Sequence, residues 1–416
     1  MWSKVNISEW TARRKGTLSE VRQPVEDIIN NVRNNGDSAL FELTERFDKV
    51  KRDSIKVSRE EIEKAYESVD PSLIEALKTS KKNIEAFHLM QRPSDMWLKE
   101  VCPGLTLGVK TTPIESVGAY IPGGRASYPS TVLMCTVPAK VAGVRKVVCC
   151  TPPPINPLTL VAADLAGVDE IYAVGGAQAI AAMALGTESV EPVQKIVGPG
   201  NVFVTTAKFM LKDTVEIDFP AGPSEIAILA DETADPEFAA ADIMAQAEHD
   251  PNAACILVTT SQKLADSVGS EIEKMLPLAQ RKEIIEKSLN NAGYVVSDSL
   301  SDAIDSINEI APEHLSIQVA DPLSALNKIK HAGSIFVGRY APVACGDYAS
   351  GTNHVLPTAG YASTYSGLDV MHFMKRSSVQ IIEREGLDRI GDTVETLSSA
   401  EGLFAHCNSV KIRRQN

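Results

Sequence analysis

Apolar residues recur at three- and four-residue spacing between Thr17 and Lys99, among many charged residues. The stretch VEDIINNVRNNGDSALFELTERFD, residues 25–48, shows the pattern, and Gly36 interrupts it. This spacing predicts amphipathic helices that pack on the surface of a core.

Short apolar runs replace this pattern between Val101 and Ala230, where Gly, Pro, Ala and β-branched residues increase and charges become sparse. Buried strands are predicted at 146–151 (KVVCCT), 170–174 (EIYAV) and 195–198 (KIVG), with segments of helical length between them. Such alternation predicts parallel βαβ units.

The alternation returns in the second half of the chain. Strands are expected at 225–231 (EIAILAD) and 254–260 (ACILVTT). Between them, Asp235 is expected to cap a helix that has Pro236 in its first turn. After Gly367 the strand pattern stops, and helices are expected to near the end of the chain.

Composition places the chain among ordinary soluble proteins. Of 416 residues, 44% are apolar and 23% charged, which excludes disordered, collagen-like and disulfide-stapled classes. A formal net charge of −13 disfavours nucleic acids and anionic membranes as partners. There are seven cysteines without a CxxC pair, no signal-peptide start and no apolar run of about 18 residues. We therefore expect a cytoplasmic protein.

Glycine-rich turns follow the expected strands, although no GxxxxGK[ST] or GxGxxG fingerprint occurs. They read YIPGG (120–124), GGAQ (175–178) and GPGN (198–201). Such turns let a ligand approach the backbone at a helix N-terminus, but they also serve as ordinary strand-to-helix connections. Taken alone, the turns leave both interpretations open.

Two pairs of side chains and one polar stretch are candidates for chemistry. Gln246 and His249 stand three apart at the end of a predicted helix, where they could bind one cation or simply face solvent. Glu313 and His314 follow a proline just before the strand LSIQV, so they could accept protons from a substrate or form an exposed turn. The stretch 345–358 (CGDYASGTNHVLPT) is typical of a binding loop.

Eight segments together resemble the histidinol dehydrogenase family, in the family's order and spacing over nearly the whole chain. They are PGGRASYPSTVLMC, VGGAQAIAAMALGT, GPGN, DFPAGPSE, AQAEHD, APEHLS, GDYASGTNHVLPT and EGLFAH. Enzymes of this family oxidise L-histidinol to L-histidine through an aldehyde, with two NAD per turnover and one zinc ion per active site. The resemblance implies the same reaction for this chain.

The resemblance also implies a role for each candidate residue. His314 is the implied base for the alcohol proton, and Glu313 is implied to activate water for attack on the aldehyde. The implied zinc ligands are Gln246, His249, Asp347 and His406. The implied NAD contacts are Tyr120, Gln178 and Asn201. The implied substrate contacts are Ser224, Gln246, His249, Glu313, His314, Asp347, His354, Glu401 and His406.

The implied fold class is α/β: two incomplete Rossmann-like domains with parallel-rich sheets, plus a small helical C-terminal tail that packs on the partner subunit. The expected domains are an N-terminal arm (1–15), a discontinuous α/β domain with most catalytic and zinc-binding residues (16–118 and 225–367), an α/β domain with the NAD-binding turns (119–224) and a dimerisation tail (368–416). In the family, a glutamate and a histidine of the tail serve the partner's active site. A homodimer with shared active sites is therefore expected.

Three residues near the implied zinc site need separate mention. Asp250 follows His249 where some members of the family have glycine, and its charge could tune the metal. Cys345 and Cys407 adjoin implied ligands, but both thiols are expected to be inert because the ligand set is complete without them.

Two other functions compete with this one. A related zinc- and NAD-dependent dehydrogenase of another polar alcohol, such as a sulfonated diol, would use the same scaffold. Glu401 argues against it, because a carboxylate suits the ammonium of histidinol and repels a sulfonate. A binding protein without activity is disfavoured, because Glu313, His314 and all four implied ligands have the residue types that the chemistry requires.

Overall fold

A computed structural model describes residues 2–14, 18–123, 128–220 and 222–415. Gly124 of the YIPGG turn, positions 125–127 of the PGGRASYPST segment and Ala221 of DFPAGPSE lie outside the described residues, as do the expected limits at 1, 15, 16 and 416. The described chain forms two compact units. The main unit runs to Gln91 and resumes over Glu115–His372, and the tail unit comprises Arg92–Ile114 and the chain from Phe373 on.

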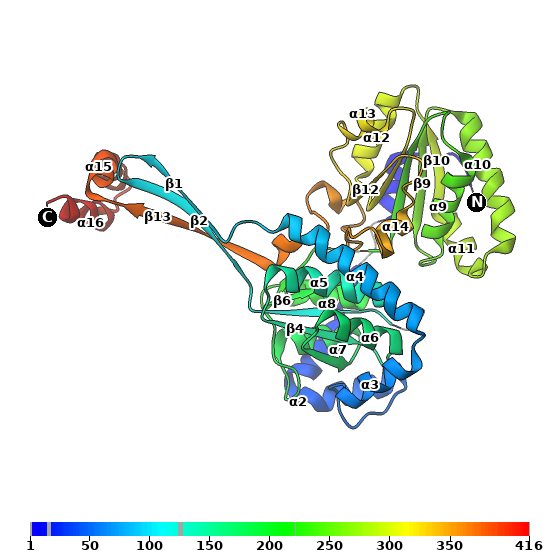
Figure 1. Cartoon of the computed structure of the whole chain (residues 1–416), viewed down its shortest axis with the longest axis horizontal. Helices are drawn as coiled ribbons and strands as arrows, with labels where there is room; N and C mark the ends of the chain where they lie inside the picture. The colour runs from blue at the N-terminus through cyan, green and yellow to red at the C-terminus, as the bar shows by residue number, and fades with distance from the viewer. Residues whose placement is uncertain (1, 15–17, 124–127, 221, 416) are drawn as a thin grey trace. The chain divides into compact units, whose positions relative to one another are not determined.

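Sheet 1 of the main unit is parallel, with strand order β5-β4-β3-β6-β7 (Figure 1). Its strands are β3 (Ser116–Tyr120), β4 (Lys146–Thr151), β5 (Glu170–Ala173), β6 (Lys195–Val197) and β7 (Glu216–Ile217). Its connecting helices are α5 (Pro129–Ala142), α6 (Pro157–Ala166), α7 (Gly176–Leu185) and α8 (Val202–Met210). The three strands predicted in this region are confirmed, and nearly all their apolar side chains are buried.

Sheet 2 repeats the arrangement, with parallel order β10-β9-β8-β11-β12. Its strands are β8 (Glu225–Ala230), β9 (Ala254–Thr259), β10 (Ala292–Val296), β11 (His314–Gln318) and β12 (Ser334–Val337). Its helices are α9 (Pro236–Ala247), α10 (Gln262–Met275), α11 (Lys282–Ser288), α12 (Leu300–Ile310), α13 (Pro322–Leu326) and α14 (Val343–Tyr348). The Asp235 side chain accepts the Glu237 N–H, which confirms the predicted cap.

Both sheets are covered on two faces, as expected for parallel sheets. In β8, Ile226 and Ile228 join the apolar core that contains residues of α9 and α10, whereas Ala227 and Leu229 join the core that contains residues of α12. Successive side chains therefore point to opposite faces. In both sheets the strands, numbered by their order in the chain, follow 3-2-1-4-5. This is the Rossmann order without its sixth strand, and it confirms the expected fold class.

The N-terminal helices are α1 (Ile7–Arg13), α2 (Arg22–Asp48), α3 (Arg59–Ser68) and α4 (Pro71–Gln91). Gly36 interrupts α2 with a φ of 52°, as predicted. Helix α2 packs on α7 and α8, and α3 packs on α6. Both therefore pack on connecting helices of sheet 1. The domain limits expected from the sequence grouped these residues with 225–367, and those limits stay a prediction.

The tail unit contains strands where the sequence predicted helices. Its antiparallel sheet has the order β1-β2-β13, with β1 (Met96–Cys102), β2 (Leu105–Pro113) and β13 (Met374–Ile382). Helices were expected throughout the chain after Gly367 and up to Lys99, which is wrong for β13 and for the start of β1. Most side chains of β1 and β13 are exposed, so no alternation of buried and exposed positions marks them.

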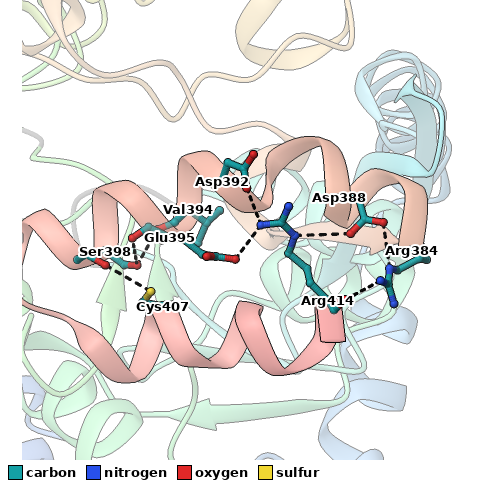
Figure 2. Close-up of polar contacts among 9 residues, drawn as sticks. Arg384, Asp388, Asp392, Val394, Glu395, Ser398, Cys407 and Arg414 are labelled. Carbon is teal, nitrogen blue, oxygen red and sulfur yellow. Dashed lines mark hydrogen bonds and ion pairs between the residues drawn. The ribbon is translucent and has the colours of Figure 1, made fainter. Parts of the chain in front are cut away.

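Two helices end the chain as expected, α15 (Arg384–Ala400) and α16 (Phe404–Gln415). Figure 2 shows how Arg414, in the last turn of α16, contacts three carboxylates of α15. Its Nη1 lies 2.7 Å from Asp392 and 2.8 Å from Glu395, and its Nε lies 3.5 Å from Asp388. These ion pairs hold the two helices together at the chain's end. In neither unit is a described helix both long and apolar enough to span a membrane.

Candidate active site

Both expected catalytic residues, Glu313 and His314, lie at the amino edge of sheet 2. Glu313 directly precedes β11 and His314 begins it, while Ser224 directly precedes the neighbouring strand β8. Helix α9 runs back along the sheet between two parallel strands, so its C-terminal residues reach the same edge. Ligands of open parallel sheets usually bind at the carboxyl edge, so this placement is unusual.

The His314 ring is held in one tautomer by its surroundings. Its Nδ1 lies 3.1 Å from the backbone oxygen of Glu225 and 3.4 Å from Oε2 of Glu313. A carbonyl oxygen only accepts hydrogen bonds, so Nδ1 carries the proton. The buried Nε2 has no hydrogen-bond partner among the described residues, and Asp347 Oδ1 lies 3.8 Å from it. When the ring is neutral, its lone pair therefore lies on Nε2.

Two neighbouring charges act on His314. Burial alone would lower its pKa, but the charge and hydrogen bond of Glu313, helped by the charge of Asp347, raise the pKa to about 9. A cation bound at Asp347 would oppose this shift.

Glu313 is fixed by a reciprocal exchange with Glu225 on the adjacent strand. The Glu225 N–H donates to Oε2 of Glu313 (2.7 Å), and the Glu313 N–H donates to Oε1 of Glu225 (3.2 Å). Both side chains are buried. Sequence reasoning missed Glu225, although it lies inside the DFPAGPSE segment, because nothing in the pattern distinguishes a buried strand carboxylate from an exposed one.

The main unit carries three of the four implied zinc ligands. Gln246 is buried in the last turn of α9, and its Nε2 has no partner among the described residues. His249 lies in a turn just beyond the end of α9, where its N–H donates to the Gln246 backbone oxygen (3.3 Å). Asp347 is buried in α14, and its backbone oxygen lies 3.0 Å from Nδ1 of His354.

The His354 ring lies beside Asp347, one of these implied ligands. Burial lowers its pKa, Asp347 opposes the shift, and the nearby His314 and His249 add to it. Of these groups Asp347 is in contact with the ring, since its Oδ1 lies 4.0 Å from Nδ1 of His354. Over the described ranges, no group of three or more His, Cys, Asp or Glu side chains could by itself hold a metal ion. A zinc site would therefore need Gln246 and one further ligand. The buried Gln246 side chain fits that role through its amide oxygen, because an amide NH2 group only donates hydrogen bonds.

The polar stretch 345–358 is only partly a loop. Its first four residues complete α14, and the rest is irregular and largely buried. Two contacts join it to α5: Nδ2 of Asn353 donates to the Met134 backbone oxygen (2.8 Å), and Nε2 of His354 lies 3.1 Å from Oγ1 of Thr131. Thr131 lies inside the PGGRASYPSTVLMC segment, but the sequence did not single it out as a neighbour of His354.

The implied NAD contacts lie at the carboxyl edge of sheet 1. Tyr120 ends β3 with a buried hydroxyl that accepts the Gly176 N–H (3.1 Å), and burial raises its pKa to about 12. Gln178 is buried in the first turn of α7. Asn201 caps α8 by accepting the N–H groups of its second and third residues at 3.0 and 3.2 Å. These residues shape the turns at which a dinucleotide would bind.

Glu401 and His406 belong to the tail unit, where both are exposed. The adjacent Cys407 is buried, and its sulfur accepts a hydrogen bond from Ser399 (3.3 Å). Cys345 is exposed in α14.

Comparison with known proteins gives a consistent result over the whole chain. The family model for histidinol dehydrogenase matches residues 11–414. The chain is 53% identical to histidinol dehydrogenase of Methanosarcina mazei over 99% of its own length and 96% of the relative's. It is 50% identical to that of Methanocaldococcus jannaschii, over 96% and 94% of the two chains.

A solved structure agrees with these relatives. The crystal structure of histidinol dehydrogenase from Elizabethkingia anophelis has a TM-score of 0.95 at 39% identity, covering 100% of this chain and 97% of the other. The match extends over both parallel sheets and the tail, so it is not confined to one domain. This chain belongs to the histidinol dehydrogenase family.

Proposed function

We propose that this chain oxidises L-histidinol to L-histidine in two NAD-dependent steps, with His314 and Glu313 as its proton acceptors. The family consists of NAD-dependent oxidoreductases of histidine biosynthesis that act on a small molecule, and membership supports the reaction. The observation that carries the residue assignment is the buried, unpartnered Nε2 of His314 beside Asp347. A cytoplasmic location is part of the proposal.

In the first step, His314 takes the proton of the substrate hydroxyl on Nε2. Its Nδ1–H stays on the Glu225 carbonyl oxygen, so the ring needs no tautomer change before it accepts the proton. The positive charge that develops on the ring is stabilised by Glu313, 3.4 Å away, and by Asp347. NAD, when bound, supplies the hydride acceptor.

In the second step, Glu313 takes a proton from the water that attacks the aldehyde. Its Oε2 is held by the Glu225 N–H, which keeps the carboxylate in one orientation. Two acceptors on adjacent residues suit two successive proton transfers, because each half-reaction releases its proton at a different place.

Zinc would be held by Gln246, His249, Asp347 and His406. This mixed nitrogen and oxygen set suits zinc, which when bound can position a substrate nitrogen and act as a Lewis acid. The substrate contacts Ser224, His354 and Glu401 complete the proposal. Glu401 would meet the substrate ammonium.

A homodimer with shared active sites belongs to the same proposal. Glu401 and His406 are exposed in the tail unit. The tail unit also exposes a set of large apolar side chains, which is typical of a protein interface. These are Met96, Trp97, Leu98, Val101, Ile381, Ile382, Leu397, Leu403, Phe404 and Ile412. Mixed dimers of His406→Ala and His314→Ala subunits should therefore recover activity that neither parent has, and no recovery in verified mixed dimers would refute shared sites.

NADH absorbance tests the proposal directly. Zinc-loaded protein with excess NAD and limiting L-histidinol should form two NADH per histidinol, and a chelator-treated sample should form none until zinc is restored. The control is the same treated sample with its far-UV circular dichroism unchanged. No NADH from folded, zinc-loaded protein would refute histidinol as the substrate and lead to a panel of other polar alcohols, a sulfonated diol among them.

A further inference from the structure

Arg14, the residue that follows helix α1, is a buried arginine far in sequence from the candidate active-site residues. Only 4% of its side chain is exposed. Its Nη1 lies 2.7 Å from Oε1 of Glu225, its Nη2 donates to the Ile310 backbone oxygen (2.8 Å), and its guanidinium lies 4.6 Å from the centre of the Trp10 ring. All three contacts restrain the guanidinium.

Glu225 connects Arg14 to the catalytic pair through three of its groups, which are Oε1, the backbone N–H and the backbone oxygen. Its Oε1 accepts the Glu313 N–H (3.2 Å) and the Ala359 N–H (3.1 Å), in addition to facing Arg14. Its backbone N–H holds the Glu313 carboxylate, and its backbone oxygen holds Nδ1 of His314. Any displacement of Glu225 therefore reaches both proton acceptors.

A carboxylate at this position requires a counter-charge. The Glu225 side chain is 2% exposed, and both burial and the nearby Glu313 raise its pKa, whereas Arg14 lowers it. Without Arg14, the buried carboxylates of Glu225 and Glu313 would face each other with no counter-charge. The Glu225 carboxylate would then either move or take up a proton. Either change alters the acceptor that holds the Glu313 N–H.

We propose that Arg14 is a positioning residue for the catalytic pair, which it holds in place through Glu225. The proposal rests on the roles of Glu313 and His314 proposed above. Arg14 touches neither of them, so it acts on the reaction by fixing the main chain and side chain of the residue that touches both.

The test compares Arg14→Met with Arg13→Met. Arg13 precedes Arg14 directly in the chain, but its side chain is 69% exposed and its carboxylate partner is Glu9 at 3.9 Å, so it is a matched control. For Arg14→Met we expect kcat per folded site to fall about 10²-fold, the effect of a displacement of order 1 Å, with KM for histidinol within about threefold of the parent. Arg13→Met should match the parent in both constants.

Two further variants keep the proposal falsifiable if Arg14→Met folds poorly. Arg14→Lys retains the charge, so it should recover at least about tenfold in kcat over Arg14→Met. Adding Glu225→Gln to Arg14→Met removes both buried charges while leaving an amide oxygen as acceptor, so the double variant should also exceed Arg14→Met in kcat. A purely structural role predicts instead that activity follows the folded fraction, measured by circular dichroism, in every variant.

Several results would overturn the inference. These are an Arg14→Met kcat within about twofold of the parent, an equal loss in Arg13→Met, or kcat values that follow only the folded fraction. His314→Ala and Glu313→Gln, measured alongside, report on the catalytic roles themselves. If both keep the parental kcat, those roles fail, and the inference falls with them. If they lose activity while Arg14→Met does not, the inference alone fails.

Discussion

Replacement of Lys208 by methionine tests how the GPGN turn is held at the carboxyl edge of sheet 1. Lys208 (α8) and Asp218 form an ion pair in which their side chains are 6% and 2% exposed. The pair also holds both peptide groups of Gly198: Nζ of Lys208 donates to the Gly198 oxygen (3.0 Å), and the Gly198 N–H donates to Oδ2 of Asp218 (2.8 Å). The turn thus depends on two buried charges.

The expected magnitude follows from this burial. Lys208→Met leaves Asp218 as an uncompensated buried charge, which costs about 3–5 kcal/mol of unfolding free energy. Adding Asp218→Asn removes both charges, so the double variant should lose only about 1–2 kcal/mol, mainly through weaker hydrogen bonds to Gly198. The double variant should therefore be more stable than Lys208→Met by roughly 2–3 kcal/mol.

Urea unfolding, followed by far-UV circular dichroism, measures the free energy of unfolding of the parent and of both variants. The values are compared with one common slope of free energy against urea concentration. NADH binding, followed by its fluorescence, should weaken for Lys208→Met under conditions where the variant is folded, because Asn201, the expected NAD contact, is the last residue of the same turn. The reasoning is refuted if Lys208→Met loses less than about 1 kcal/mol, or if the double variant is as unstable as the single one.

Three other predictions follow from single residues. Gly198→Ala should lower the melting temperature and lose more than about 1 kcal/mol, because φ is +111° and a Cβ would lie 2.2 Å from a backbone oxygen at the end of β3. Glu313→Gln should reduce NADH formed per histidinol from two toward one, with the aldehyde trapped by a hydrazine, and an unchanged yield of two would contradict its role. Burial alone would raise the pKa of Glu170, but Lys56 and Lys146 lower it to about 2. The stability difference between the parent and Glu170→Gln should therefore be constant above about pH 4.5 and shrink as the pH falls toward 2, and a difference that grows on acidification would contradict it.

The sequence alone predicted several strands of both parallel sheets, although it did not signal β3, β7, β10 or β12. The strands β4 and β9 are short apolar runs because both of their faces are buried, and a buried run between helical segments is a local signal. The N-cap of α9 and the break at Gly36 were predicted for the same reason, since capping and a positive φ depend on neighbouring residues.

Strand β13 could not be predicted in this way. It pairs with β2, which precedes it by more than 250 residues, from Met374 opposite Pro113 to Ile382 opposite Leu105. Most of its side chains are exposed, so the local pattern shows no alternation. Its hydrogen-bonding partner, which no local window contains, determines that this segment is a strand.

The candidate active site also combines features that the sequence predicted with features that only the folded chain determines. Residue type and motif order pointed to Glu313, His314 and Gln246 as the chemically important groups. Only the tertiary structure brought Arg14 to Glu225 and Thr131 to His354, since each pair is separated by more than 200 residues. Packing also determined which nitrogen of His314 is free, because the tautomer depends on a carbonyl oxygen of the adjacent strand β8. Burial and hydrogen-bond partners are properties of the folded chain, and they fix the orientation of the Glu313 carboxylate and the His314 ring.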